Sequence, residues 1–372
     1  MKIRHDVLTW WALAASPCAF AQAGLAPPGT MQLYGQATAA VTHKTNQTGG
    51  VSNKEMSSSL FAASFFGLRG TEDLGGGMAA VFRIESILAL NNGSAGATVG
   101  GQSKFWNRQA FVGMNLSPTV TVTAGRQFHA ASDRVIRSLD VYQVGGTSAH
   151  VTPLALFGVN RFFGNDSRVD SSLKVRLNPT TGGFQGAVSA GINDGAGRSV
   201  SAEAAQVTPG YALGAYVIRF QSPNLIAATG ARPENTVWGL GGNVLLGPVR
   251  LYLHYIDSEL ESATLANRPA QTNKIWNLAA SWQAAPNVLV KASYYDDKGK
   301  ALNSVVGRDG KKTSLIASAE YFLSKRTSLH VGAFSNHFTG GYKLDPVNIA
   351  ALARDPASST TSGVTAGIRH DF

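Results

Sequence analysis

The 372-residue chain is poor in charge, with 15% charged residues, 41 glycines and a mean hydropathy of −0.02. This average is too polar for a helical membrane protein, and no segment beyond the N-terminal leader approaches the 18 consecutive apolar residues of a membrane-spanning helix. The single cysteine, Cys18, excludes a disulfide framework and a cysteine-based metal site. The net charge of +10 is dispersed and forms no Lys/Arg run, so we expect no nucleic-acid partner.

The N-terminal segment has the pattern of a secretory signal peptide. Lys2 and Arg4 precede an almost uncharged stretch from residue 7 to residue 21, where two A-x-A cleavage motifs overlap. We therefore expect a signal peptide over residues 1–21, with cleavage after Ala21 or Ala23, and a single mature domain over 22–372. A buried N-terminal helix is the alternative.

Beyond the leader, runs of about ten residues alternate apolar and polar side chains, which is the period of a strand with two unlike faces. Connections rich in turn residues alternate with long polar ones. Short turns are expected near 71–77, 117–119, 178–183, 208–210, 247–248, 284–287 and 324–326, and long loops near 43–56, 88–103, 129–166, 194–198, 222–234, 258–272, 297–312 and 338–360. These connections join sixteen strands.

The strand pattern predicts an all-β fold, a 16-stranded antiparallel transmembrane β-barrel. A strand of about ten residues tilted by about 45° crosses roughly 24 Å of hydrocarbon. An even strand number places both termini on the rim with the short turns. A soluble β-sandwich would also alternate, but it would not need sixteen long strands or polar residues facing an interior.

The alternation also assigns the two faces of each strand. Trp276, Leu278 and Trp282 share one face of their strand, with polar or small residues between them. Aromatic residues near strand ends are expected in the girdles at the membrane interfaces; they are Trp238, Trp276, Trp282, Tyr321 and Phe372. The last strand alternates from Val364 to Phe372 and should pair with the first strand to close the barrel.

Six segments, in order along the chain, resemble those of the general porins of Gram-negative bacteria, of the β-proteobacterial type found in Neisseria and Burkholderia. The longest is GLRGTEDLGGGMAA at 67–80; the others are Leu33–Gly35, Asn107–Gly113, Gly125–Gln127, Tyr321–Thr327 and Arg369–Phe372. The resemblance covers essentially the whole mature chain.

The resemblance implies a homotrimeric diffusion pore for small ions and solutes in the outer membrane. Its third loop, here from His129 to about Asp166, would fold inward and narrow the lumen. The resemblance also implies contact with outer-membrane lipid and lipopolysaccharide, and recognition of the strand ending at Phe372 by the barrel-assembly machinery.

Such a pore selects solutes by its diameter and by the charges that line it. Matched to the family, Arg108 and Arg168 are the basic residues of the narrow zone. Alternation places Arg83 and Glu85 on one face, and it places Arg168, Asp170, Ser172, Lys174 and Arg176 together on the polar face of the sixth strand. The other candidates are Asp133, Arg134, Arg137, Asp140 and Arg161 on the third loop, and Arg126 and Lys174 on the wall. The alternative for each is a solvated charge without a special role.

Two features depart from the family pattern. Phe65 stands where family members carry an arginine of the second strand, and the third loop has no dense acidic cluster. The first change removes a wall cation and the second removes part of the opposing charge.

We expect a water-filled channel for passive diffusion of small hydrophilic solutes, with an anion preference, because excess positive charge raises the local concentration of anions. A substrate-specific channel for a defined anion or sugar is the alternative, although Tyr216 and Tyr252 are too scattered for an aromatic track. An outer-membrane enzyme would need a Ser/His pair, and no G-x-S-x-G turn is present. An adhesin using the long loops stays open. No cofactor is expected, and the histidines show no metal-ligand spacing.

Overall fold

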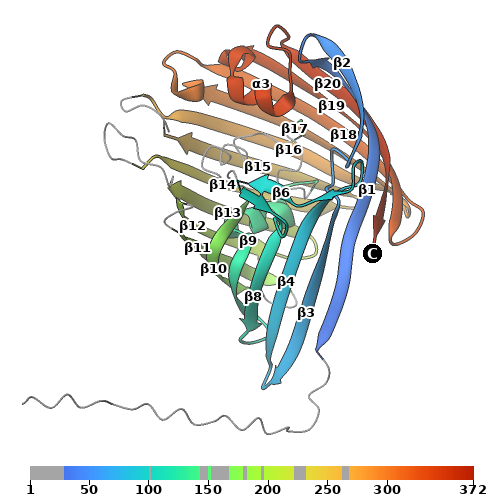
Figure 1. The fold of residues 1–372 in the computed structure, drawn as a ribbon, viewed down its shortest axis with the longest axis vertical. Coiled ribbons are helices and arrows are strands. Elements are labelled where there is room, and N and C mark those ends of the chain that lie inside the picture. Colours follow the sequence, from blue (N-terminus) through green and yellow to red (C-terminus); the bar gives the residue numbers. More distant parts are fainter. Residues whose placement is uncertain are drawn as a thin grey trace, which may run out of the picture.

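The computed structural model describes residues 29–99, 102–142, 150–151, 167–178, 182–193, 197–221, 232–261 and 268–372. Within these residues, sixteen antiparallel strands form a closed ring, as the alternation predicts (Figure 1). They are β1 (Thr30–Gln47), β3 (Phe65–Gly75), β4 (Met78–Ala89), β8 (Gln109–Asn115), β9 (Val120–Phe128), β10 (Arg168–Leu177), β11 (Gly183–Asn193), β12 (Gly197–Val207), β13 (Tyr211–Gln221), β14 (Glu234–Leu246), β15 (Val249–Leu260), β16 (Gln271–Ala285), β17 (Val288–Lys300), β18 (Gly310–Phe322), β19 (Thr327–Gly340) and β20 (Thr360–Asp371).

The ring closes where the first strand meets the last. β1 pairs with β20 from Gln36↔Asp371 to Lys44↔Gly363. Beyond this ladder, Gly35 and Phe372 exchange two backbone hydrogen bonds of 3.0 Å each. The C-terminus accordingly lies beside β1 (Figure 1). Closure removes the unpaired edge that an open sheet would present.

Small elements occupy the connections. The second long connection holds β5 (Ser94–Ala95), β6 (Ala97–Val99) and β7 (Gln102–Lys104), and the third holds α1 (Ala130–Arg134) and the π-helix η1 (Val135–Leu139). The last two carry η3 (Leu302–Ser304), η4 (Gly341–Leu344) and α3 (Pro346–Leu352). None of the helices in the described ranges has the length and apolar character needed to cross a bilayer.

The short turns fall where the sequence predicts them, but the first long loop does not. β1 continues to Gln47, and β2 (Val51–Ser57) returns along it as a hairpin, so the loop expected at 43–56 is wrong. Five of the seven side chains of β2 are polar, and most of the strand is exposed, so its sequence resembles that of a loop. The loops expected at 258–272 and 297–312 are shorter than predicted, because strands extend into them. β15 continues to Leu260, and β17 continues to Lys300.

The two faces of the barrel differ as expected. Leu253 is 53% exposed, whereas the next residue, His254, is 2% exposed. The aromatic residues Trp238, Trp276, Trp282, Tyr321 and Phe372 are all among the exposed large side chains. Trp282, Tyr321 and Phe372 lie near the rim with the short turns. Trp238 and Trp276 lie farther along their strands, on either side of Tyr255, with ring centroids 5.5 and 4.8 Å from it.

The seam between β1 and its neighbours is crowded at Gly35. A Cβ atom there would lie 2.5 Å from the Phe65 carbonyl oxygen and 2.6 Å from the Phe372 ring. We expect Gly35→Val to destabilise the barrel by about 1–3 kcal/mol through overpacking. The temperature at which the folded protein loses its fast mobility on a detergent gel should fall. Gly210→Val is the matched control, because a Cβ atom at Gly210 meets nothing within 4 Å; equal losses in both variants would contradict the account.

Candidate pore constriction

The chain turns into the barrel interior after β9. The amide of Ala130 donates to Ser189 Oγ (3.0 Å), and the amide of Ala131 donates to Ser201 Oγ (2.9 Å). Both serines point inward, because their neighbours Val188 and Val200 are 56% and 64% exposed on the outer face. The wall of the barrel thus supplies acceptors for two amides that the first turn of a helix leaves unpaired.

His129 caps this helix from its N-terminal side. Its Nδ1 accepts a hydrogen bond from the Ser132 amide (3.0 Å), and its Nε2 lies 2.7 Å from the Ser132 hydroxyl. Burial, together with the cations Lys174 and Arg168, lowers the pKa of His129 to about 3 against the opposing effect of Asp133. The imidazole is therefore neutral, which the accepting Nδ1 requires.

Buried ion pairs fasten the helical segment to the wall. Arg134 Nε lies 2.7 Å from Glu203 Oε2, and neither side chain is exposed. Arg176 Nη1 on β10 approaches the other oxygen of Glu203 at 3.3 Å. Farther along, Asn243 Nδ2 on β14 donates to the Ser138 carbonyl oxygen (2.7 Å). These contacts hold the segment from 130 to 139 against β12, β13 and β14.

Asp133 faces the other way, toward β10. Lys174 Nζ lies 2.7 Å from its Oδ2, and Arg176 contacts the same oxygen. Burial alone would raise the pKa of Asp133, but Lys174, Arg176 and Arg137 together lower it to about 2. The carboxylate stays ionised and is compensated by these cations.

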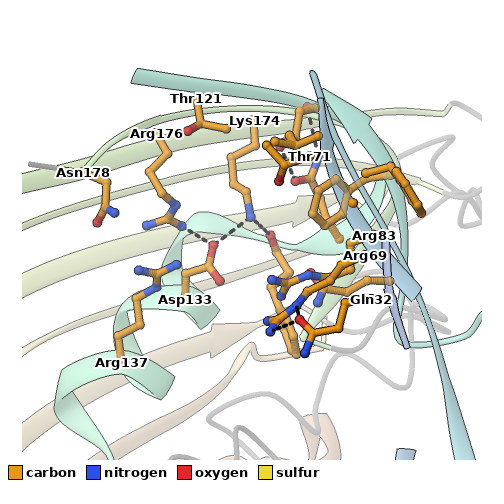
Figure 2. A pocket seen from close by; sticks show the side chains of 18 of the residues that line it. Gln32, Arg69, Thr71, Arg83, Thr121, Asp133, Arg137, Lys174, Arg176 and Asn178 are labelled. Carbon is orange, nitrogen blue, oxygen red and sulfur yellow. Dashed lines mark hydrogen bonds and ion pairs between the residues drawn. The ribbon is translucent and has the colours of Figure 1, made fainter. Parts of the chain in front are cut away.

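A cavity of about 680 Å³ lies between this segment and the wall formed by β1, β3, β4, β8, β9 and β10. Its lining includes five cationic side chains and one carboxylate; they are Arg69, Arg83, Arg137, Lys174, Arg176 and Asp133. In Figure 2, Arg137, Arg176 and Asp133 lie on one side of this space, and Arg69 and Arg83 lie on the other. The polar side chains of Gln32, Thr71, Thr121 and Asn178 surround them.

Arg83 and Glu85 point inward on β4, as the alternation predicts, but only Arg83 lines the cavity. Glu85 is 3% exposed and accepts hydrogen bonds from the Tyr34 hydroxyl and from Gln109 Nε2 (2.9 Å). Arg108 Nε approaches Glu85 at 3.4 Å, and its guanidinium lies 4.2 Å from the Phe65 ring centroid. Phe65, at the position where family members carry an arginine, thus supports Arg108 through a cation–π contact.

The loop candidates separate into different environments. Asp133 and Arg137 line the cavity, whereas Arg134 is buried against Glu203. Asp140 is 3% exposed and accepts the amide hydrogen of Tyr142 (2.9 Å). Arg161 lies outside the described residues.

The expected single polar face of the sixth strand is wrong. Ser171 has a φ of 49°, and the ladder between β9 and β10 shifts register between Val169 and Ser172. Val169 therefore packs inside the barrel, 4% exposed, while Lys174 and Arg176 keep the inward face. Arg168 and Asp170 fall on the opposite face from Val169, because a bulge inserts one residue and reverses the alternation beyond it.

A second polar cluster forms on that opposite face. Arg126 Nη1 lies 2.8 Å from Asp170 Oδ1, and Lys104 of the second long connection contacts the same carboxylate. The Arg168 guanidinium lies 4.4 Å from the Phe128 ring centroid. Neither Arg126 nor Arg168 is among the residues that line the cavity beside Lys174.

Arg176 lines the cavity and belongs to the predicted polar face of the sixth strand. One cavity cation, Arg69, was not among the sequence candidates. Arg69 lies within the 67–80 motif and shares the inward face of β3 with Gly67 and Thr71. Its Nε and Nη2 donate to Gln32 Oε1 at 3.0 and 2.8 Å.

The comparisons with known proteins agree with this architecture. Residues 8–341 match the sequence profile of the Gram-negative porin family. The chain belongs to this family. It is similar to an outer membrane porin protein of Bordetella pertussis, with 27% identity over 351 residues that cover 83% of this chain and 82% of the relative.

Solved porins share the fold at lower identity. An anion-selective porin from Comamonas acidovorans superposes with a TM-score of 0.73 at 20% identity, covering 93% of this chain and all of the other. OmpT of Vibrio cholerae superposes with a TM-score of 0.66 at 14% identity, covering 92% and 98%. The protein is a porin, a β-barrel channel of the outer membrane of Gram-negative bacteria.

The pair between Arg134 and Glu203 should matter for the stability of this porin. Glu203→Gln leaves the buried Arg134 charge uncompensated, which costs about 3 kcal/mol. We expect a lower unfolding temperature in detergent. Glu234→Gln is the matched control, since its partner Arg219 is 64% exposed and such pairs contribute about 1 kcal/mol at most. A loss no larger than that of the control would contradict a stabilising role for the buried pair.

Proposed function

We propose that this porin prefers anions and that the cavity beside the third loop is its selective zone. The observation that carries the proposal is the lining: five cationic side chains stand against the single carboxylate of Asp133 among the described residues. Charges of one sign in a low-dielectric passage concentrate ions of the other sign.

The one carboxylate does not balance this field. Asp133 is held between Lys174 and Arg176, so its charge is already compensated within the wall. Arg69 and Arg83 line the other side of the cavity, where Arg69 contacts the neutral Gln32 and Arg83 lies 3.8 Å from Glu85. The solved Comamonas acidovorans porin of the same fold is named as anion-selective, which is consistent with this proposal.

Neutralising cavity cations should weaken the anion preference. We expect Arg69→Gln/Arg83→Gln to shift the reversal potential in a potassium chloride gradient toward the cation side, because two charges leave the selective zone. Lys325→Gln, on the exposed turn between β18 and β19, is the matched control and should leave the reversal potential unchanged. The measurement is planar-bilayer recording of purified protein. Equal potentials in the double variant and the wild type would contradict the proposal.

We also propose a homotrimer, as the family resemblance implies. One solved relative, OmpT of Vibrio cholerae, is described in a trimer form. Conductance steps in groups of three would support this assembly, and single steps with a monomeric mass in detergent would contradict it.

The surroundings of the barrel follow from the same proposal. The outward aromatic residues would lie at the membrane interfaces, in contact with lipid and lipopolysaccharide. The barrel-assembly machinery would recognise the strand that ends at Phe372. Residues 1–21 would be removed on export. Mass spectrometry of the protein from outer membranes should find Gln22 or Gly24 as the first residue, and an intact leader would contradict this.

The family and fold point to a channel rather than an enzyme, and we infer that the protein has no catalytic activity. Labelling by a serine-directed covalent probe would contradict this inference.

A further inference from the structure

The chain between β2 and β3 contains more residues than the ladder can hold. β1 pairs with β2 at Ala40↔Ser57 and with β3 at Gln36↔Phe65. Three residues of β1, 37–39, therefore face seven residues, 58–64, on the neighbouring side. The longer segment has to leave the sheet.

Segment 58–64 leaves the sheet toward the inside of the barrel. Leu60 is 6% exposed and belongs to the interior cluster that contains Val135 and Leu139 of the third loop. Phe61 lies over Gly332, where an added Cβ atom would come within 2.3 Å of the ring. Gly332 faces inward on β19, since its neighbour Val331 is 55% exposed on the outer face. The segment thus crosses the inner surface from β1 to β19.

Hydrogen bonds hold the C-terminal end of this segment in place. The Ser64 hydroxyl donates to the Thr38 carbonyl oxygen and accepts from the Thr38 amide, both at 2.9 Å. Gln36 Nε2 donates to the Ala63 carbonyl oxygen (2.9 Å). Backbone that leaves a strand needs such partners when it is buried. These contacts fix the C-terminal end of segment 58–64 to the inner surface of β1.

The segment meets the third loop through two aromatic rings. Phe61 and Tyr142 stack with centroids 5.1 Å apart and planes inclined by 19°. The Tyr142 hydroxyl donates to the Lys291 carbonyl oxygen on β17 (3.3 Å). Stacked aromatic pairs of this kind are stabilised beyond the area that they bury. The contact joins the third loop to the part of the wall opposite β9 and β10.

The stacked pair lines the smaller of two cavities inside the barrel. A cavity of about 60 Å³ lies against Phe61 and Tyr142, lined also by Lys291, Glu320, His330 and Arg369. The cavity of about 680 Å³ shares none of its lining residues with it. The larger space has five cations and one carboxylate in its lining. The smaller one has two cations, Lys291 and Arg369, and one carboxylate, Glu320, which pairs with Arg369 at 3.1 Å.

We infer that segment 58–64 and Tyr142 form a second barrier, which closes the β17–β20 side of the lumen and confines permeation to the arginine-lined cavity. The inference rests on the proposed ion path through that cavity. Phe61 then determines specificity without lining the larger cavity, because it denies ions a route whose lining has a smaller excess of positive charge.

The test compares single-channel conductance and reversal potential of the wild type with those of Phe61→Ala, Tyr142→Ala and the double variant. We expect each single variant to conduct about 1.2–2-fold more current, because the open cross-section limits flow. The double variant should add little to either single one, since both remove the same contact. The anion preference should fall as conductance rises.

A second variant moves Phe61 without deleting it. In Gly332→Ala the new methyl group would overlap the Phe61 ring, so this variant should reproduce the higher conductance of Phe61→Ala. Two controls should keep the wild-type current: Phe61→Leu, which preserves most of the bulk, and Phe105→Ala, which truncates a ring that is 51% exposed. Fast mobility on an unheated detergent gel confirms that each variant is folded.

The outcomes separate the two proposals. An anion-selective wild type whose Phe61→Ala and Gly332→Ala variants conduct like the wild type would overturn the second barrier alone. A wild type without anion preference whose variants conduct more would overturn the proposed selectivity and leave the barrier standing.

Discussion

Backbone hydrogen bonding is the constraint on which this structure depends. In hydrocarbon, an unpaired amide or carbonyl group has no water to satisfy it, so a sheet that crosses a membrane has to close on itself. The ladder between β1 and β20, finished by the exchange between Gly35 and Phe372, accomplishes this closure. Once the ring is closed, the strand period of two sends every second side chain to lipid and the rest to the interior.

Two segments of the chain fold into the interior, and the polar groups of both form hydrogen bonds or ion pairs with the barrel wall. At the start of the third loop, two backbone amides donate hydrogen bonds to Ser189 and Ser201. Arg134 of the same segment pairs with Glu203. Segment 58–64 enters from the other side and meets the loop at Tyr142. Between the third loop and the wall that includes β3, β4 and β10 lies the cavity whose charged lining residues are mostly cationic. The shape and the charge of this cavity are linked through Arg176, which pairs with Glu203 in the anchor of the loop and also contacts Asp133, the one carboxylate of the cavity among the described residues.

Features decided by local chemistry could be predicted from the sequence. Alternation and turn residues located the strands and the short turns, and the inward direction of Arg83 followed from parity. The bulge at Ser171 could not be predicted, because nothing in the local pattern marks a left-handed serine, and it moved Arg168 away from Lys174. The path of the third loop depends on partners more than 50 residues away. Glu203 gave no signal of this path, because an inward carboxylate in a water-filled barrel can be hydrated as well as paired.

The central claim is that ions cross this porin through a passage whose fixed charge is positive. Reversal potential of the purified wild-type protein, recorded in a tenfold potassium chloride gradient, tests it most directly. The account predicts a potential whose sign shows that chloride crosses more readily than potassium, at both neutral and mildly acidic pH. A potential of the opposite sign, with potassium the more permeant ion, would contradict it.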